Sequence, residues 1–183
     1  MSDLAAEIAD VRARAERVYT RAQVDAAFER VAADISTVLA GSNPLLLAIL
    51  VGGMYPAIQL AMRLSFPYQL DCVHVTRYRG QLAGGDVEWR SQPRLPVAGR
   101  VVLVVDDILD EGHTLAQVMH ECTRLGAARV LSAVLVRKRH PRPTIGHADY
   151  HGLEVGDRYV FGCGMDYKEY FRGLPEIYAV ASS

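Results

Sequence analysis

The chain has 183 residues, of which half are apolar and 22% are charged, and its formal net charge is −1. This composition favours a packed globular domain over disorder, and the near-neutral charge excludes a general attraction to nucleic acid or to an anionic membrane. The longest apolar stretch, 44–54, is too short to span a bilayer, and no signal peptide is expected at the N-terminus. Three widely separated cysteines predict reduced thiols in a cytoplasmic protein.

The N-terminal quarter of the chain is predicted to be helical. Apolar residues recur at helical spacing within 3–17, and Thr20 with Gln23 resembles a capping box at the start of a second helix over 21–40. A Gly-Ser-Asn-Pro run ends this second helix. We therefore expect an N-terminal helical segment over 1–42.

The middle of the chain is predicted to alternate between strands and helices. Continuous apolar runs without polar alternation indicate strands that are buried on both faces, as in a parallel sheet. In chain order we expect a strand at 45–51, a helix at 55–64, a strand at 70–79, a polar glycine-rich loop at 80–86, a strand at 101–105, a helix at 113–125 and a strand at 129–137. This order predicts an α/β fold with a mainly parallel, twisted sheet flanked by helices.

The C-terminal quarter has weaker signals. A stretch rich in Pro, Gly and His predicts a loop over 141–157, and short strands are expected at 158–161 and 177–180. No repeat or linker divides the chain, so we expect one domain over 1–183 with its core at 43–140.

The strongest functional signal is a cluster of acids between the strand at 101–105 and the following helix. Its four carboxylates lie within six positions and belong to Asp106, Asp107, Asp110 and Glu111. One such acid could be only a helix cap, but four together predict a bound cation or polar ligand. Gly112 and the helix N-terminus offer backbone N–H groups to an anion, and Thr114 adds a hydroxyl. A phosphorylated sugar with Mg²⁺ suits both features.

The run from Val102 to Leu115 resembles the signature of the type I phosphoribosyltransferases that binds 5-phosphoribosyl-1-pyrophosphate (PRPP). Three later runs, 134–139, 152–162 and 165–174, resemble the hypoxanthine-guanine branch of this family, and the similarity extends from about residue 47 to 180. The resemblance implies the type I phosphoribosyltransferase fold, with a small hood formed by terminal segments, including 141–183. It also implies a Mg²⁺-dependent purine salvage enzyme that converts hypoxanthine or guanine and PRPP to IMP or GMP and pyrophosphate.

The resemblance further implies roles on the PRPP side of the site. Asp106 and Asp107 would hold the ribose hydroxyls, directly or through Mg²⁺. The 5′-phosphate would meet the backbone of Asp110, Glu111, Gly112, His113 and Thr114. Pyrophosphate would meet Arg172 and the loop containing Val51 and Gly52, where the preceding Leu50–Val51 peptide is cis in relatives.

On the purine side, the resemblance implies that Asp110 is the general acid/base at N7. Lys138 would donate to the 6-oxo group, Tyr159 would stack on the base, and the Val160 backbone would meet its pyrimidine edge. Asp166 would ligate a second Mg²⁺. Tyr78 matches a tyrosine of the mobile loop that closes over the reacting groups. By residue type alone, Lys138 would belong to a solvated basic strand end and Tyr159 to ordinary rim aromatics.

Several residues depart from the family pattern. Asp106 replaces a common Glu, while Glu111 and His113 replace Thr and Lys, so the backbone amides become the main expected donors to the 5′-phosphate. None of the six histidines is predicted to be catalytic.

Two alternatives stay open: a PRPP-sensing regulator that binds nucleic acid through 137–142, and a xanthine-preferring enzyme. The near-neutral charge and the presence of Asp110 favour the enzyme, with PRPP and a purine as partners and neither nucleic acid nor membrane. By analogy with relatives, a homodimer or homotetramer is expected, in contact through the second helix or the segment after Gly53.

Overall fold

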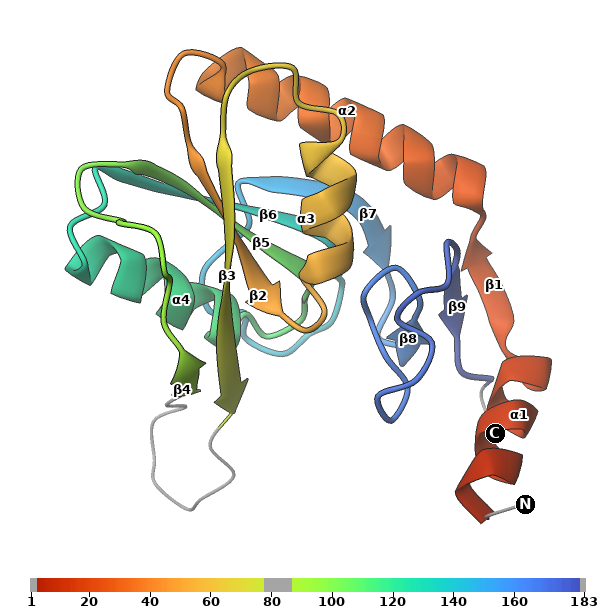
Figure 1. Ribbon diagram of the computed structural model, residues 1–183. Helices are drawn as coiled ribbons and strands as arrows, with labels where there is room; N and C mark the ends of the chain where they lie inside the picture. Colours follow the sequence, from red (N-terminus) through yellow and green to blue (C-terminus); the bar gives the residue numbers. More distant parts are fainter. Residues whose placement is uncertain (1–2, 78–86, 182–183) are drawn as a thin grey trace.

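The computed structural model describes residues 3–77 and 87–181, so Tyr78 and the predicted loop at 80–86 lie outside the described residues. The strands of the central sheet are β2 (Leu45–Leu50), β3 (Gln69–Arg77), β4 (Val87–Ser91), β5 (Val101–Leu109), β6 (Arg129–Lys138) and β7 (Tyr150–Val155). They lie in the order β4-β3-β2-β5-β6-β7, and every neighbouring pair is parallel except β3 and β4 (Figure 1). The predicted mainly parallel sheet is confirmed.

Helices cover both faces of this sheet. Helices α2 (Arg21–Leu39) and α3 (Met54–Ala61) lie on one face, and α4 (His113–Arg124) lies on the other (Figure 1). Side chains of β2 alternate between the two cores, with Leu46 and Ala48 on the α2 side and Leu45 and Leu47 on the α4 side. Because both faces are covered, the central strands are apolar at nearly every position.

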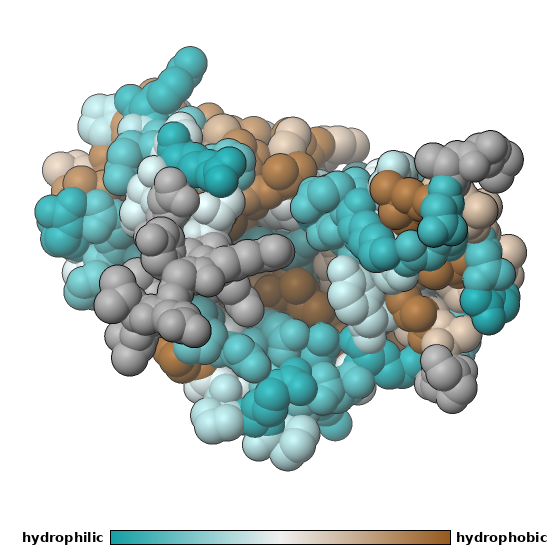
Figure 2. Space-filling model, turned by 90° about the horizontal axis from the view of Figure 1, so that it is seen from below, coloured by the Kyte–Doolittle hydropathy of each residue, from teal (hydrophilic) through white to brown (hydrophobic). Residues whose placement is uncertain are grey.

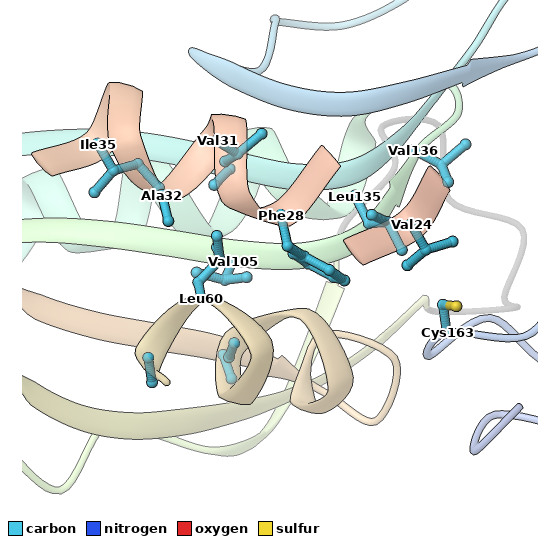
Figure 3. Packing of buried hydrophobic residues seen from close by; sticks show 14 of the residues in the cluster. Val24, Phe28, Val31, Ala32, Ile35, Leu60, Val105, Leu135, Val136 and Cys163 are labelled. Carbon is cyan, nitrogen blue, oxygen red and sulfur yellow. The ribbon is translucent and has the colours of Figure 1, made fainter. Parts of the chain in front are cut away.

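The α2 core is built on helical periodicity. The buried side chains of α2 pack over α3 and over the central strands, with Leu60, Val105 and Leu135 among their neighbours (Figure 3). They include Val24, Phe28, Val31, Ala32 and Ile35. Their spacing of three or four residues places them on one face of the helix. No helix in the described ranges is long and apolar enough to cross a membrane.

The start of α2 confirms the predicted capping box. The Thr20 hydroxyl accepts a hydrogen bond from the Gln23 N–H at 3.3 Å, and the Gln23 side chain accepts one from the Thr20 N–H at 2.9 Å. Both N–H groups would otherwise lack a partner within the helix, so the pair stabilises this terminus.

A second, antiparallel sheet forms a hood beside the main one, in the order β1-β9-β8 (Figure 1). Its strands are β1 (Glu16–Tyr19), β8 (Val160–Phe161) and β9 (Ile177–Ala179). Helix α1 (Asp3–Arg14) precedes β1, and its Glu7 carboxylate accepts hydrogen bonds from the Tyr167 hydroxyl at 2.8 Å and from Lys168 Nζ at 2.6 Å. The hood therefore joins the two terminal segments of the chain.

Several predicted boundaries were wrong, including the end of the helix expected at 55–64, which is at Ala61. The first helix ends at Arg14, because 16–19 pair with β9 instead of continuing the helix. The predicted loop at 141–157 contains β7, which adds to the edge of β6. The strand expected at 101–105 extends to Leu109, because its last residues still pair with β6. Strand β4 was not predicted at all.

Candidate active site

The parallel strands bring most of the predicted site residues to one edge of the sheet. Asp106 and Asp107 lie near the end of β5, and Lys138 ends the neighbouring strand β6. A cleft of about 170 Å³ lies here, and it is lined by Asp107, Ile108, Asp110, Lys138, Tyr159, Val160, Met165 and Asp166. The space-filling view of this side shows a hollow near the middle of the molecule with hydrophobic residues at its floor (Figure 2).

Asp106 and Asp107 carry adjacent carboxylates that are mostly enclosed by protein. Burial, and then the charge of Asp107, raises the pKa of Asp106 well above its usual range, and burial also raises the pKa of Asp107. Asp107 Oδ1 accepts a hydrogen bond from the Ile108 N–H at 2.7 Å, and Asp106 Oδ1 accepts one from the Asp107 N–H at 2.9 Å. Two carboxylates in this state suit a divalent cation or sugar hydroxyl donors.

Asp110 is surrounded by basic side chains. Lys138 Nζ donates to its Oδ2 at 2.9 Å, and Arg142 Nη2 donates to its Oδ1 at 3.1 Å. His140 Nε2 lies 2.9 Å from the same Oδ1. Partial burial raises the pKa of Asp110, but the donors outweigh burial and the net effect lowers it. Asp110 is therefore a carboxylate anion beside Lys138 in the cleft.

The turn from Asp110 to Thr114 joins β5 to α4. Gly112 has a φ of +85°, in the left-handed region that favours glycine, and a Cβ there would lie 2.2 Å from the carbonyl oxygen of Ile145. The Ile145 N–H in turn donates to the Glu111 carbonyl at 2.7 Å. The first N–H groups of an α-helix lack partners within the helix, so this turn presents donors to an anion.

The turn after β2 packs directly against the acid pair. The Leu50–Val51 peptide bond is cis. A Cβ on Gly52 would lie 2.0 Å from Asp107 Oδ2, and a Cβ on Gly164 would lie 2.3 Å from the Gly52 carbonyl oxygen. Glycine at both positions therefore allows the turn and the C-terminal segment to meet at Asp107.

The C-terminal segment supplies the other wall of the cleft. Tyr159 is 54% exposed and meets Tyr167 edge-on, with ring centroids 5.6 Å apart. Arg172 Nη2 pairs with Asp166 Oδ1 at 2.7 Å, and Arg172 Nη1 donates to the Gly164 carbonyl at 2.8 Å. Arg172 thus holds Asp166 at the cleft.

The structure also identifies site residues that sequence reasoning missed. Ile108 and Met165 line the cleft, while His140 and Arg142 contact Asp110. The basic run 137–142 was the only signal for the last two, and it does not specify an acidic partner. Over 3–77 and 87–181, no group of three or more His, Cys, Asp or Glu side chains could hold a metal ion.

Comparisons with known proteins agree with this geometry. A family model described as "Phosphoribosyl transferase domain" matches residues 15–169. The chain is 31% identical to a hypoxanthine-guanine phosphoribosyltransferase of Streptococcus pneumoniae, over 85% of this chain and 87% of that protein. It is 27% identical to a hypoxanthine-guanine-xanthine phosphoribosyltransferase of Tritrichomonas foetus, over 88% and 90%. Among solved structures, a Trypanosoma cruzi hypoxanthine phosphoribosyltransferase variant complexed with IMP has a TM-score of 0.85 at 25% identity, covering 92% of both chains.

Proposed function

Because this chain belongs to the phosphoribosyl transferase domain family, we propose that it transfers the 5-phosphoribosyl group of PRPP to hypoxanthine or guanine in purine salvage. The products are IMP or GMP and pyrophosphate. Relatives named for these bases cover most of the chain and support the assignment. The observation that carries it is the cleft in which Asp107, Asp110 and Lys138 lie together opposite Tyr159.

On the ribose side, Asp106 and Asp107 accept the sugar hydroxyls and stabilise the positive charge that develops as the bond to pyrophosphate breaks. Their raised pKa values fit a bound cation, because a cation offsets the cost of their buried charges. One Mg²⁺ held by these two residues and a second held by Asp166, each completed by substrate oxygens, would neutralise pyrophosphate. Arg172 and the backbone of Val51 and Gly52 bind pyrophosphate in this scheme.

The 5′-phosphate binds to the backbone N–H groups of the turn from Asp110 to Thr114. The negative charge of Glu111 in this turn is partly offset by Arg142, whose Nε lies 3.3 Å from Glu111 Oε1. The carboxylate that Glu111 introduces into the turn is therefore compensated by an arginine from outside the turn.

On the purine side, Asp110 takes the N7 proton and Lys138 donates to the 6-oxo oxygen. A 6-amino group offers Lys138 a donor in place of an acceptor, so adenine is rejected. The Tyr159 ring stacks on the base, and the Val160 backbone meets its pyrimidine edge. Tyr78, outside the described residues, is proposed to close over the site.

The regulator alternative has less support. Arg137 and Arg139 both pair with Glu154, while Lys138 and Arg142 pair with Asp110. A basic run whose charges are already matched within the chain is a weak attractant for phosphates.

We also propose a cytoplasmic homo-oligomer with one domain over 1–183. Exposed apolar side chains on α3 and at its C-cap support a contact surface there, and they belong to Met54, Ile58 and Met62.

The decisive experiment is turnover of hypoxanthine, guanine, xanthine and adenine with PRPP and Mg²⁺. We expect nucleotide from hypoxanthine and guanine and at least about a hundredfold lower kcat/KM for adenine, since a mismatched hydrogen bond discriminates strongly. If xanthine is the best substrate, the proposed preference for hypoxanthine and guanine is wrong. Absence of product with all four bases would contradict the enzyme assignment, and fast adenine turnover would contradict the role of Lys138.

A further inference from the structure

His140 is a buried histidine directly beside the proposed general acid/base. Its side chain has no exposed surface, although it follows the exposed Arg139. Its Nε2 lies 2.9 Å from Asp110 Oδ1, yet neither ring nitrogen makes an aligned hydrogen bond within the part of the chain that the structure describes. Buried polar groups are nearly always hydrogen-bonded in folded proteins, so an imidazole in this state needs an explanation.

The two oxygens of Asp110 have different neighbours. Oδ2 is held by Lys138, which lines the purine cleft. Oδ1 is approached by His140 and Arg142. A second cavity, of about 350 Å³, is lined by His140 and lies against Asp110 as well, so Asp110 forms part of the wall of both cavities.

The two neighbours of Oδ1 are also unequal. Arg142 makes two hydrogen bonds to Asp157, at 2.8 and 3.0 Å, and lies 3.3 Å from Glu111. It is therefore shared among three carboxylates. His140 makes no other ion pair within 3–77 and 87–181, so its only acidic neighbour at hydrogen-bonding distance is Asp110.

We propose that His140 is a positioning residue that fixes Asp110 Oδ1, so that Oδ2 is presented to the purine N7. The inference rests on the proposed function, in which Lys138 leaves Oδ2 for the 6-oxo oxygen of the bound base. Oδ2 then has no donor from Lys138, and the carboxylate keeps its orientation only through Oδ1. An imidazole turned so that Nε2–H points at Oδ1 would donate to it, and a neutral ring with its proton on Nε2 is sufficient.

The test compares His140→Gln, His140→Asn and His140→Phe with the wild-type enzyme. Glutamine is long enough to place an amide N–H near the position of Nε2, asparagine is one carbon shorter, and phenylalanine fills the space without a donor. We expect kcat for hypoxanthine to fall about tenfold or more in the Asn and Phe variants, because misplacing a reacting group by about 1 Å has large effects on rate. The Gln variant should stay within about threefold of wild type, and KM for PRPP should stay nearly constant throughout.

Two controls make the outcome decisive. His120→Asn changes an exposed histidine on α4 and should leave kcat unchanged. Thermal melting checks that each variant folds, and if the Phe variant unfolds, the Asn and Gln pair decides. Equal kcat in the Asn and Gln variants would overturn the proposal.

Asp110→Asn separates this inference from the proposed function. If Asp110→Asn is inactive while His140→Asn is normal, only the positioning role fails. If Asp110→Asn retains the wild-type rate, the role of Asp110 fails and the positioning role fails with it.

Discussion

At the scale of single residues, the raised pKa of Asp106 predicts that this carboxyl group destabilises the ligand-free protein at neutral pH. Its folded-state pKa is raised above the ordinary value of 3.8, so the folded protein binds this proton more tightly than the unfolded chain does. Protonation of Asp106 therefore stabilises the folded state fully below the pKa that this residue has in the unfolded chain. The stabilisation is lost as the pH rises through the pKa of Asp106 in the folded protein. At neutral pH the wild type therefore either keeps a poorly solvated charge or takes up a proton at a cost in free energy, and an asparagine avoids both.

We predict that Asp106→Asn raises the melting temperature near pH 7.5 by about 2 °C or more, the shift that roughly 1 kcal/mol produces in a domain of this size. The difference should shrink toward pH 4, and turnover should fall in the same variant. Thermal melts without Mg²⁺ from pH 4 to 8 measure the effect, with the exposed Asp34→Asn as control. A melting temperature equal to or below that of wild type at pH 7.5 would show that the carboxylate is not destabilising.

The residues of the purine side illustrate what sequence can and cannot predict at this scale. Asp110 and Lys138 could each be identified from motifs, but they are 28 positions apart and their contact depends on the register of β5 against β6. His140 and Arg142 matched no motif with an assigned function. Their contacts with Asp110 exist only because the chain after β6 folds back over the turn at Gly112.

At the scale of elements, the turn after β2 contains two glycines with different tasks. A Cβ on Gly52 would meet the Asp107 carboxylate, which is a side chain that can move. A Cβ on Gly53 would meet the backbone carbonyl oxygens of Val105 and Ile49 at 2.5 and 2.6 Å, which cannot move without distorting β5 and β2. The absence of a side chain at Gly52 therefore preserves the geometry of the site, and its absence at Gly53 preserves the packing of the two strands.

We predict that Gly52→Ala lowers kcat about tenfold or more, since it displaces a carboxylate of the site, with little change in melting temperature. Gly53→Ala should instead lower stability by roughly 2 kcal/mol or more, as overpacking of a rigid site does. Steady-state kinetics and denaturant unfolding separate the two effects. Gly41→Ala is the control, because a Cβ there meets nothing within 4 Å. Similar losses of stability in both variants of the turn would refute the distinction.

The elements that sequence analysis missed share one property. Strands β4 and β7 are the two edges of the main sheet, and β1 is an edge of the hood. An edge strand has one neighbour and is often less buried, so its sequence lacks the continuous apolar run of β2 or β5. Whether an edge strand forms depends on its pairing with a distant segment, and a local sequence pattern does not indicate that pairing.

At the scale of the whole molecule, α3 has an apolar stripe that the described residues leave uncovered. Met54 and Ile58 on α3 and Met62 at its C-cap are 51%, 48% and 72% exposed, and their spacing of four places them on one side of the helix. Such a stripe is typical of a surface covered by another subunit.

We predict that Ile58→Glu reduces the mass of the assembly in light scattering, because it introduces a charge into an apolar contact. Val38→Glu on α2, where the exposed fraction is 44%, is the matched variant for the other expected contact surface. Dissociation by Val38→Glu but not by Ile58→Glu would move the contact to α2.

Asp110 lies in the cleft between the main sheet and the hood, where we propose that it is the general acid/base of a purine phosphoribosyltransferase. Formation of IMP from hypoxanthine and PRPP with Mg²⁺ by the wild type and by Asp110→Asn tests it most directly. We predict rapid IMP formation by the wild type and a fall of about 100-fold or more in kcat for the variant, the usual scale for loss of a general acid/base. No IMP from the wild type, or equal rates from both proteins, would contradict the account.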